Sequence, residues 1–382
     1  MDIRQADINP NCWYVVAPSA ELKGDRPLGV TLWQQDIVLY RHTDGTVSAL
    51  EDRCPHRQVK LSQGKVLGDR LECAYHGWQF EASGRCARVP YLQARQKLPA
   101  CKLQPYPVRE QDGFIWLFPG DAALADRLPL LGLPEWDDLN FIASVATIEC
   151  QAHFSFLIEN LMDMYHGHLH QDWQAWAEAS LEEIRETDAR VDADYSAQSY
   201  YRIDKIWSVL QLFVPALRRL HPEPLRVSYV YPHWYSTLGQ DFRIYCLFCP
   251  VGPRQTRAYL IHFTSLQSFW RLHKLPVWFR RGLKNALFGS AKGLLAGLVR
   301  QDVVAIEQEQ QAYLENPSRR NYELNQTAAS VQRAIRFQAL AAHRAPDDLP
   351  TVTNDILALD PEGCARDAIA TYSSDRANSR SK

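Results

Sequence analysis

The chain has 382 residues, of which 46% are hydrophobic and 23% charged, and its mass is 43.8 kDa. This length and composition predict two folded domains with sizeable cores and exclude wholesale disorder. The 42 Lys and Arg are nearly balanced by 44 Asp and Glu, which excludes a generally basic nucleic-acid binder. The first ten residues contain three charged side chains and no apolar run. We therefore expect no signal peptide and a cytoplasmic protein.

Turn residues cut the first part of the chain into short segments. The runs 13–16, 36–40 and 113–118 are typical of strands, and turns are indicated at 43–45 and 110–113. We therefore predict an all-β domain over residues 10–120. The chain holds nine cysteines, an odd number, which favours reduced thiols over a disulfide framework.

The second part, residues 121–345, mixes helix and strand signals. A helix is predicted over 154–170, because apolar residues there recur on one face, and another is predicted to run from about Val299 to about 316. Strands are predicted over 199–204, 226–238, 241–251 and 257–266. Short connections between strands favour an antiparallel sheet, so the predicted class is α+β. The polar tail, residues 360–382, is predicted to be disordered.

Two cysteines and two histidines form a pair of spaced motifs, Cys54-Pro-His56 and Cys73-x-x-His76. Each motif places one thiolate and one imidazole on a tight loop, and residues 61–71 can form a hairpin that brings the loops together. Zinc sites usually pair like with like on each loop, whereas a two-iron cluster with two Cys on one iron and two His on the other uses this mixed pairing. Two imidazoles also leave the oxidised cluster neutral, which raises its reduction potential. The pattern predicts a Rieske [2Fe–2S] cluster, and a structural zinc site is the alternative.

A second candidate metal site lies in residues 159–170, which contain three histidines. On a helix His166 and His170 point the same way, while His168 lies on roughly the opposite face. Two imidazoles plus one carboxylate form the facial triad of a non-haem ferrous oxygenase. The alternative is a solvated, histidine-rich helix end.

The carboxylate of such a triad has to come from a distant segment. Asp302 lies between Val299 and Ile306 on one face of a predicted helix, so its side chain turns inward. An unpaired acid is costly there, and buried acids are usually paired or bound to metal. We therefore select Asp302 over Glu307 and Glu309 as the third ligand. The alternative is an acid that only stabilises a helix start.

With these motifs the chain resembles the Rieske non-haem iron oxygenases, specifically the catalytic (alpha) component of ring-hydroxylating oxygenases and demethylases. The resemblance runs from Trp13 to about Arg336. The motifs that carry it are Cys54-Pro-His56-Arg57, Leu61-Ser62-x-Gly64, Cys73-x-Tyr75-His76-Gly77-Trp78, Glu159-Asn160-x-x-Asp163-x-x-His166 and Gln301-Asp302. It implies a Rieske domain followed by a catalytic domain of the helix-grip (START-like) type.

The resemblance also implies which residues bind the two metal centres and which residue links them. The cluster ligands are Cys54, His56, Cys73 and His76, and the iron ligands are His166, His170 and Asp302. Asp163, in one motif with Asn160, is implied to bridge an iron histidine of one subunit and a cluster histidine of its neighbour, in a homotrimer. Many members of the family have four residues between the two iron histidines. This chain has three between His166 and His170, so the choice of His170 over His168 rests on helical spacing.

The implied reaction begins with a ferredoxin or flavin reductase that draws on NAD(P)H and reduces the cluster. The electron passes through the Asp163 bridge to ferrous iron, which activates O2. The outcome is hydroxylation, dihydroxylation or oxidative demethylation of an apolar or aromatic organic substrate. The alternative is a Rieske electron-transfer protein without oxygenase activity, which requires that His166, His170 and Asp302 do not converge.

Two further patterns lie outside these motifs. Cys246-x-x-Cys249 falls within a predicted strand, where the two side chains point to opposite faces, so we interpret both as core cysteines. Residues 242–301 contain ten Lys and Arg and no acid. The basic amphipathic segment 276–299 can lie on an anionic membrane surface, dock an acidic electron donor or cover the substrate pocket. Peripheral membrane contact through 276–299 is therefore an expectation.

Overall fold

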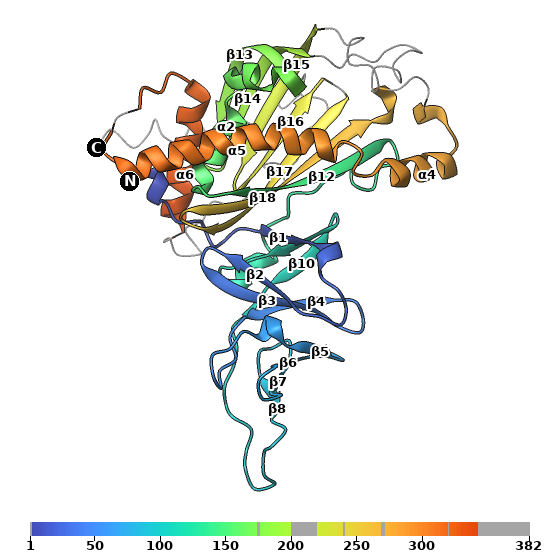
Figure 1. Cartoon of the computed structure of the whole chain (residues 1–382), viewed down its shortest axis with the longest axis vertical. Helices are drawn as coiled ribbons and strands as arrows, with labels where there is room; N and C mark the ends of the chain where they lie inside the picture. Colours follow the sequence, from blue (N-terminus) through green and yellow to red (C-terminus); the bar gives the residue numbers. More distant parts are fainter. Residues whose placement is uncertain are drawn as a thin grey trace, which may run out of the picture. The chain divides into compact units, whose positions relative to one another are not determined.

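The computed structural model describes residues 2–173, 176–199, 220–239, 241–268, 272–319 and 321–342, with the backbone alone for 171–173 (Figure 1). The predicted tail over 360–382 lies outside these residues, as do 200–204 of one predicted strand. No helix among the described residues is long and apolar enough to cross a membrane.

Small antiparallel sheets form the N-terminal part, as predicted. Among the described residues their strand orders are β1-β11-β10, β2-β3-β4-β9 and β5-β6-β7-β8. The strands are β1 (Tyr14–Pro18), β2 (Leu28–Leu32), β3 (Gln35–Arg41), β4 (Val47–Glu51), β5 (Lys65–Leu67), β6 (Arg70–Glu72), β7 (Gln79–Phe80), β8 (Cys86–Arg88), β9 (Pro105–Tyr106), β10 (Val108–Gln111) and β11 (Phe114–Leu117). The predicted hairpin between the two Cys/His motifs is β5–β6, which turns through Gly68 and Asp69.

A larger antiparallel sheet forms the second part, so the α+β class is confirmed. Within the described residues its seven strands follow the order β12-β18-β17-β16-β15-β14-β13. They are β12 (Phe141–Cys150), β13 (Trp176–Glu186), β14 (Arg190–Ser199), β15 (His221–Val230), β16 (His233–Leu238), β17 (Phe242–Gly252) and β18 (Gln255–Ser265). β14 alternates half-buried and buried residues, which is the period-two pattern of a strand with one covered face.

Helices cover one face of this sheet, and Figure 1 shows α5 lying across it. The helices are α1 (Ala122–Ala125), α2 (Phe154–Met162), α4 (Val277–Leu287), α5 (Lys292–Glu315) and α6 (Gln326–Ala341). Shorter 3₁₀ segments include η1 (Ile3–Gln5), η3 (Leu61–Gln63) and η4 (Tyr165–Trp173). α2 packs against α5 and α6, so the candidate iron segment that follows α2 lies close to α5.

Three of the predicted elements are wrong in extent. The helix predicted over 154–170 ends at Met162, because Asp163 takes an extended conformation, and a separate 3₁₀ segment follows. The strand predicted over 226–238 is two strands, β15 and β16, with a turn at Tyr231 and Pro232. The amphipathic segment 276–299 contains the whole of α4 and the start of α5, separated by a break that contains Gly289 with φ +77°.

Other elements were not predicted at all. β12, with alternating burial in its second half, and α6, with buried residues on one helical face, were missed, whereas β13 has no buried residue. β13 contains four Glu and two Ala, residues that are depleted in strands, and it becomes a strand by pairing with β14. Tertiary pairing therefore overrides local propensity at this edge of the sheet.

A single core runs through both parts. It contains Val16 and Ile115 from the N-terminal sheets together with Cys246 and Phe248 from β17. His233 of β16 adds a polar link across this contact, since its Nε2 lies 3.0 Å from the carbonyl oxygen of Trp13. The boundary at residue 120 remains a prediction. Cys246 and Cys249 are both buried, as expected for core cysteines.

Candidate metal centres

The two Cys/His loops have the same backbone hydrogen bonds. The N–H of Cys54 donates to the carbonyl five residues later, and its C=O accepts from the N–H four residues later, both at 2.8 Å. Cys73 repeats the two bonds at 2.8 and 3.0 Å. Local backbone geometry therefore presents each thiol and its partner imidazole in the same way, before any metal is considered.

The side chains of the two loops face one another. Cys54 and Cys73 are almost fully buried, and the imidazole rings of His56 and His76 lie 4.6 Å apart between centroids. The ring of Trp78 stacks on His56 at 4.8 Å. The four sequence-predicted cluster residues are thus brought together at one end of the N-terminal part.

Three observations bear on what this set can hold. Nδ1 of His76 is buried without any hydrogen-bond partner, as suits a nitrogen that binds a metal. Burial raises the pKa of the Cys54 thiol to about 11, while the backbone N–H groups of His56 and Arg57 favour its thiolate. In the described residues, three possible metal-binding atoms lie within 4.8 Å of one another only at a different site, described below. The four Cys and His atoms of the two loops therefore do not surround a single point. A single tetrahedral zinc needs ligand atoms about 3.3–3.8 Å apart, so the arrangement fits a two-iron cluster better.

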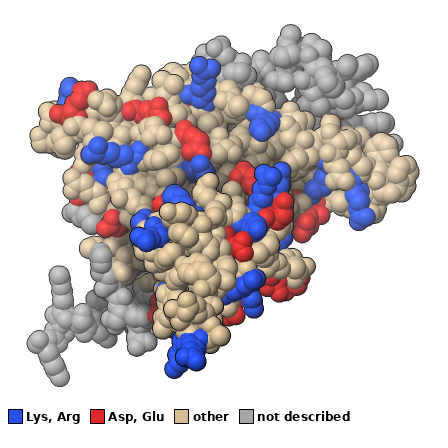
Figure 2. Space-filling view, turned by 60° about the horizontal axis from the view of Figure 1, so that its bottom comes forward, with Lys and Arg blue, Asp and Glu red and all other residues tan. Residues whose placement is uncertain are grey.

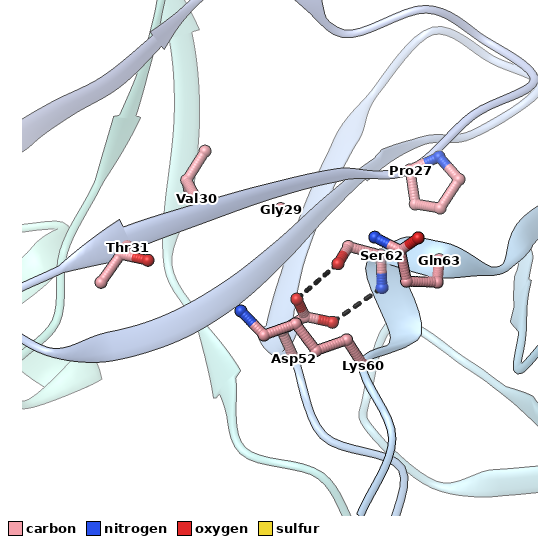
Figure 3. A pocket seen from close by; sticks show the side chains of 8 residues that line it. All are labelled: Pro27, Gly29, Val30, Thr31, Asp52, Lys60, Ser62 and Gln63. Atoms are coloured by element: carbon pink, nitrogen blue, oxygen red, sulfur yellow. Dashed lines mark hydrogen bonds between the residues drawn. The ribbon is translucent and has the colours of Figure 1, made fainter.

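At each loop a carboxylate just before the cysteine accepts hydrogen bonds from a residue that follows the loop, and so holds the two ends of the loop together. Asp52 is 2% exposed and accepts hydrogen bonds from the N–H and the hydroxyl of Ser62, at 2.7 and 2.6 Å. Figure 3 shows this pair beside Gly29 and Lys60, at the edge of a cavity of about 370 Å³. A Cβ on Gly29 would lie 2.8 Å from the Ser62 hydroxyl, so the backbone of β2 can approach Asp52 and Ser62 closely only because this residue has no side chain. On the second loop Gln79 donates to Glu72 at 2.8 Å.

The second centre is built from segments far apart in the sequence. His153 caps the start of α2, where its side chain accepts from the Ser155 N–H, and the helix ends before Asp163. The chain then turns into η4, which carries both His166 and His170. Asp302 comes from α5, which packs against η4.

His166, His170 and Asp302 form the one group in the described residues whose three ligand atoms all lie within 4.8 Å of one another. Oδ1 of Asp302 is 3.2 Å from Nε2 of His170 and 3.6 Å from Nε2 of His166. His170 is 1% exposed, whereas His168 is exposed. Two imidazole nitrogens and one carboxylate oxygen that converge in this way can bind a metal ion together, and a 2-His-1-carboxylate set is typical of non-haem Fe(II).

Neighbouring polar groups orient this triad. Oε1 of Gln301 lies 3.0 Å from Nδ1 of His170, so Nδ1 carries the proton and Nε2 is free to bind a metal. The amide nitrogen of Asn160 is 3.5 Å from Oδ1 of Asp302. Burial lowers the pKa of His166, which favours the neutral imidazole that a metal requires.

The other candidate residues lie elsewhere. Oδ1 of Asp163 accepts from the Tyr165 N–H at 2.8 Å, at the first residue of η4, and its side chain is half-buried. Glu307 accepts from the backbone N–H of Gln151 and so points away from the histidines. His153 is a packed histidine, with ring nitrogens 2.8 Å from Ser155 Oγ and 3.0 Å from the Ala6 carbonyl oxygen.

Sequence reasoning assigned no role to three residues around the triad. The ring of Trp176 lies 5.4 Å from that of His166 and 5.1 Å from that of His170, and its indole N–H donates to the Met164 carbonyl. Gly167 packs against this tryptophan, because a Cβ there would lie 2.7 Å from its indole nitrogen. Gln301 precedes Asp302 directly. A glycine between two histidines and an amide beside an inward acid are the signals that could have indicated them.

Comparison with known proteins agrees with this geometry. The Rieske [2Fe–2S] domain family matches residues 12–107. The 4β-methylsterol monooxygenase of Methylococcus capsulatus is 35% identical over 344 residues, covering 87% of this chain and 88% of that protein. The chain belongs to the Rieske oxygenases.

Two further comparisons show that similarity to Rieske oxygenases extends over part of the chain in sequence and over most of it in fold. The oxygenase component of dicamba O-demethylase from Stenotrophomonas maltophilia is 37% identical over 159 residues, covering 41% of this chain and 46% of that protein. A crystal structure of dicamba monooxygenase with non-haem iron and dicamba shares the fold, with a TM-score of 0.66 at 24% identity, over 89% of this chain and 100% of that one.

These results confirm the predicted class of enzyme. This Rieske oxygenase uses a [2Fe–2S] cluster and a mononuclear non-haem iron for oxidative hydroxylation or demethylation. It takes electrons from a ferredoxin or reductase and acts on an organic substrate. Nothing in the comparison supports the alternative of an electron carrier without oxygenase activity.

Proposed function

We propose that this Rieske oxygenase is a monooxygenase that hydroxylates a methyl group of a large, apolar polycyclic substrate of the sterol class. The extent of the similarity to 4β-methylsterol monooxygenase carries the proposal. A match over 87% of the chain necessarily includes every residue from Cys54 to Asp302. The 159-residue match to dicamba O-demethylase is too short to reach from one to the other.

The N-terminal loops supply the electron-transfer centre in this proposal. Cys54 and Cys73 would bind one iron of the cluster, and His56 and His76 the other. The bonds from Asp52 to Ser62 and from Glu72 to Gln79 hold the two loops in place. Such preorganisation favours rapid transfer, because little has to move when the charge of the cluster changes.

His166, His170 and Asp302 would hold the ferrous ion. An Fe(II) ion bound by two imidazoles and one carboxylate supplies open coordination positions for dioxygen, and the cluster supplies single electrons. Gln301 keeps the Nε2 of His170 directed at the ion, and Asn160 contacts the carboxylate of Asp302. The ring of Trp176 lies beside both imidazoles, where it excludes water and offers an apolar surface to a substrate.

The proposal includes a homotrimer in which Asp163 links the two kinds of centre across a subunit boundary. Charge supports this assembly. Residues 53–102, around the cluster, hold ten Lys and Arg against three Asp and Glu. Residues 159–194, which include the segment with His166 and His170, hold ten Asp and Glu against two Arg. Opposite net charges of +7 and −8 would attract the cluster part of one subunit to the iron part of the next.

The oligomer is tested by analytical ultracentrifugation. A species of three times 43.8 kDa is expected at low salt. Because surface attraction is screened by ions, we expect partial dissociation at high salt. Asp163→Asn should leave the trimer and both metals in place but slow product formation. A monomer with full activity would contradict this part of the proposal.

The substrate class is tested with reduced holoenzyme and a panel of candidate substrates. A 4-methylsterol should stimulate oxygen uptake and give a hydroxylated product by mass spectrometry. Methoxybenzoates, which resemble the substrates of aromatic O-demethylases, should not. Asp302→Ala is the control for metal-dependent turnover. Stimulation by methoxybenzoates alone would overturn the sterol proposal and leave the oxygenase class intact.

A sterol-like substrate is dissolved in membranes rather than in water. The proposal therefore retains peripheral contact of residues 276–299 with a membrane surface.

A further inference from the structure

The helix α4 is fixed to the catalytic part by its inner side. Leu283 and Leu287 pack against Ile142 of β12 and Leu266. Nζ of Lys284 donates to the carbonyl oxygens of residues 136 and 138, at 2.5 and 2.6 Å. Arg280 donates to the side-chain oxygen of Asn140 at 2.6 Å. These two cations are used inside the fold, so they do not contribute to any surface that α4 offers.

The outer side of α4 exposes large apolar side chains. At the first turn Val277, Trp278 and Phe279 are 52%, 75% and 43% exposed, and Phe288 after the helix is 53% exposed. Side chains of this size are usually covered in a folded protein, and a contiguous exposed group of them marks an interaction surface. Phe288 lies at the other end of α4, where its ring packs on Trp136. We call Val277, Trp278 and Phe279, with the cations described next, the α4 tip.

Basic residues flank this apolar group. Lys274, Arg281 and Lys292 are exposed, and none of these three side chains has a hydrogen bond or ion pair with another described residue. No acid occurs anywhere in residues 242–301. In Figure 2 the side of the molecule that carries α4, at the right, shows blue Lys and Arg side chains in a largely uncharged surface. The nearest acids, Asp137 and Asp138, lie beside Lys284 on the inner side of α4. An apolar group with exposed cations beside it matches the surface of an anionic bilayer, whose interior is apolar and whose headgroups are negatively charged.

We propose that the α4 tip docks this enzyme on an anionic membrane, with Trp278 and its apolar neighbours in the headgroup region and the three cations on lipid phosphates. Trp and Phe favour the interface between water and hydrocarbon, and Lys and Arg near anionic lipid add affinity. An acidic protein would use the cations but would need a matching pocket for Trp278. A bilayer accepts any convex apolar group. The docking itself does not depend on the substrate, whereas its use in substrate delivery rests on the proposed function.

The docking is tested by co-sedimentation of the holoenzyme with vesicles, without any substrate present. Vesicles of phosphatidylcholine alone are compared with vesicles that contain phosphatidylglycerol, at low and high salt. The wild-type enzyme should sediment with the anionic vesicles at low salt and should be released by salt. Binding that is equal for both kinds of vesicle, or absent from both, would overturn the proposal.

Two variants separate the apolar and the electrostatic contributions. Trp278→Ser combined with Phe279→Ser should abolish sedimentation. Arg281→Glu combined with Lys292→Glu should weaken binding by at least about twentyfold, since each cation contributes about fivefold. The matched controls are Tyr322→Ser with Leu324→Ser, which are 87% and 92% exposed, and the exposed Lys23→Glu. If the controls lose binding as much as the test variants, the α4 tip is not the docking site.

Activity distinguishes docking from a failure of the proposed substrate. With a sterol dispersed in detergent, the Trp278/Phe279 variant should turn over at the wild-type rate. With the same sterol in anionic vesicles, its rate should fall at least about tenfold. An enzyme that sediments but oxidises no sterol would support docking and contradict the substrate. A changed sedimentation coefficient of the variant without vesicles would show that the tip contacts a second copy instead, and would overturn the membrane proposal.

Discussion

The cluster loops and the iron triad are built in opposite ways. Each cluster loop is a short local structure, in which a cysteine closes a turn through its own backbone and its partner histidine follows two or three residues later. The triad joins η4 to α5, and its closest contact links His170 to Asp302 across more than a hundred residues. One centre depends on local geometry, while the other depends on the packing of the whole catalytic part.

This difference has a physical consequence for how each centre fails. A local loop loses its metal when a ligand or a loop hydrogen bond is removed, because its shape does not depend on distant segments. The triad can also be lost when α5 shifts relative to η4 with every ligand intact. Changes at the two centres should therefore separate cleanly when cluster content and mononuclear iron are measured independently.

Asp302→Ala is expected to have the largest effect. It removes the only carboxylate of the triad, so mononuclear iron should be lost and product formation should fall by at least about a hundredfold. The cluster is held by other residues, so its absorption and its electron paramagnetic resonance signal should be unchanged. Iron analysis should give two atoms per chain in place of three.

Glu307→Gln is the matched control for Asp302→Ala, on the same helix. Its carboxylate accepts from the Gln151 N–H rather than facing the histidines, so iron and activity should stay near wild type. If Asp302→Ala also bleached the cluster, the two centres would not be independent. If Glu307→Gln lost iron and Asp302→Ala did not, the assignment of the third ligand would be wrong.

The same contrast explains what the sequence could predict. The cluster motifs and the β5–β6 hairpin between them are local, so spacing alone was enough to predict the cluster ligands and the kind of metal centre. His166 and His170 were selected by spacing on one continuous helix, yet α2 ends at Met162 and both histidines lie on a 3₁₀ segment. The structure places them together for a reason that the spacing did not contain.

Other features could not be predicted because their signal is tertiary. Trp176 begins β13, a strand whose composition does not favour a strand, and it reaches the histidines only because the chain turns back after η4. Asp302 was chosen from three acids on a predicted helix by its inward face. Nothing local to that helix indicates which histidines it meets.

Gln301→Leu should have the next largest effect. It leaves the Nδ1–H of His170 buried without an acceptor, and such a loss beside a metal ligand typically costs ten- to a hundredfold in metal affinity or activity. Gln301→Glu keeps an acceptor oxygen and should recover most of the loss. Titration with Fe(II), followed by oxygen uptake, measures both variants. A leucine variant equal to wild type would show that packing alone orients the imidazole.

Removing the Asp52–Ser62 pair should have a smaller effect, confined to the cluster. Ser62→Ala deletes one hydrogen bond to a buried carboxylate, which is typically worth about 1.5–3 kcal/mol. We expect faster loss of the cluster absorption on mild heating, with mononuclear iron retained. Ser83→Ala, in an exposed turn of the same part, is the control. Equal cluster lifetimes in the two variants would mean that the backbone bonds suffice to hold the first loop.

The smallest effect concerns the contact between the two parts, where His233 is buried. Its Nδ1 accepts from the Phe248 N–H and its Nε2 donates to the Trp13 carbonyl, so only the neutral imidazole satisfies both neighbours. Burial lowers the pKa of His233 to about 3, from an ordinary value of 6.5. Because the unfolded chain then binds the extra proton, the stability that this group contributes is complete above pH 6.5 and is lost as the pH falls toward 3.

At pH 5.5 the loss from this group should be about 1.4 kcal/mol relative to pH 7.5. Burial also lowers the pKa of His153 and of His262, each to about 4, which adds to the same slope. His233→Gln should have a lower free energy of unfolding at pH 7.5. Between pH 7.5 and 5.5 it should lose less of that free energy than the wild type, because about one proton fewer is taken up on unfolding. Denaturant unfolding at both pH values measures this, with the exposed His168→Gln as control. If His233→Gln kept the wild-type slope, the contact would not sense protonation, and acid would weaken the sheet through other groups.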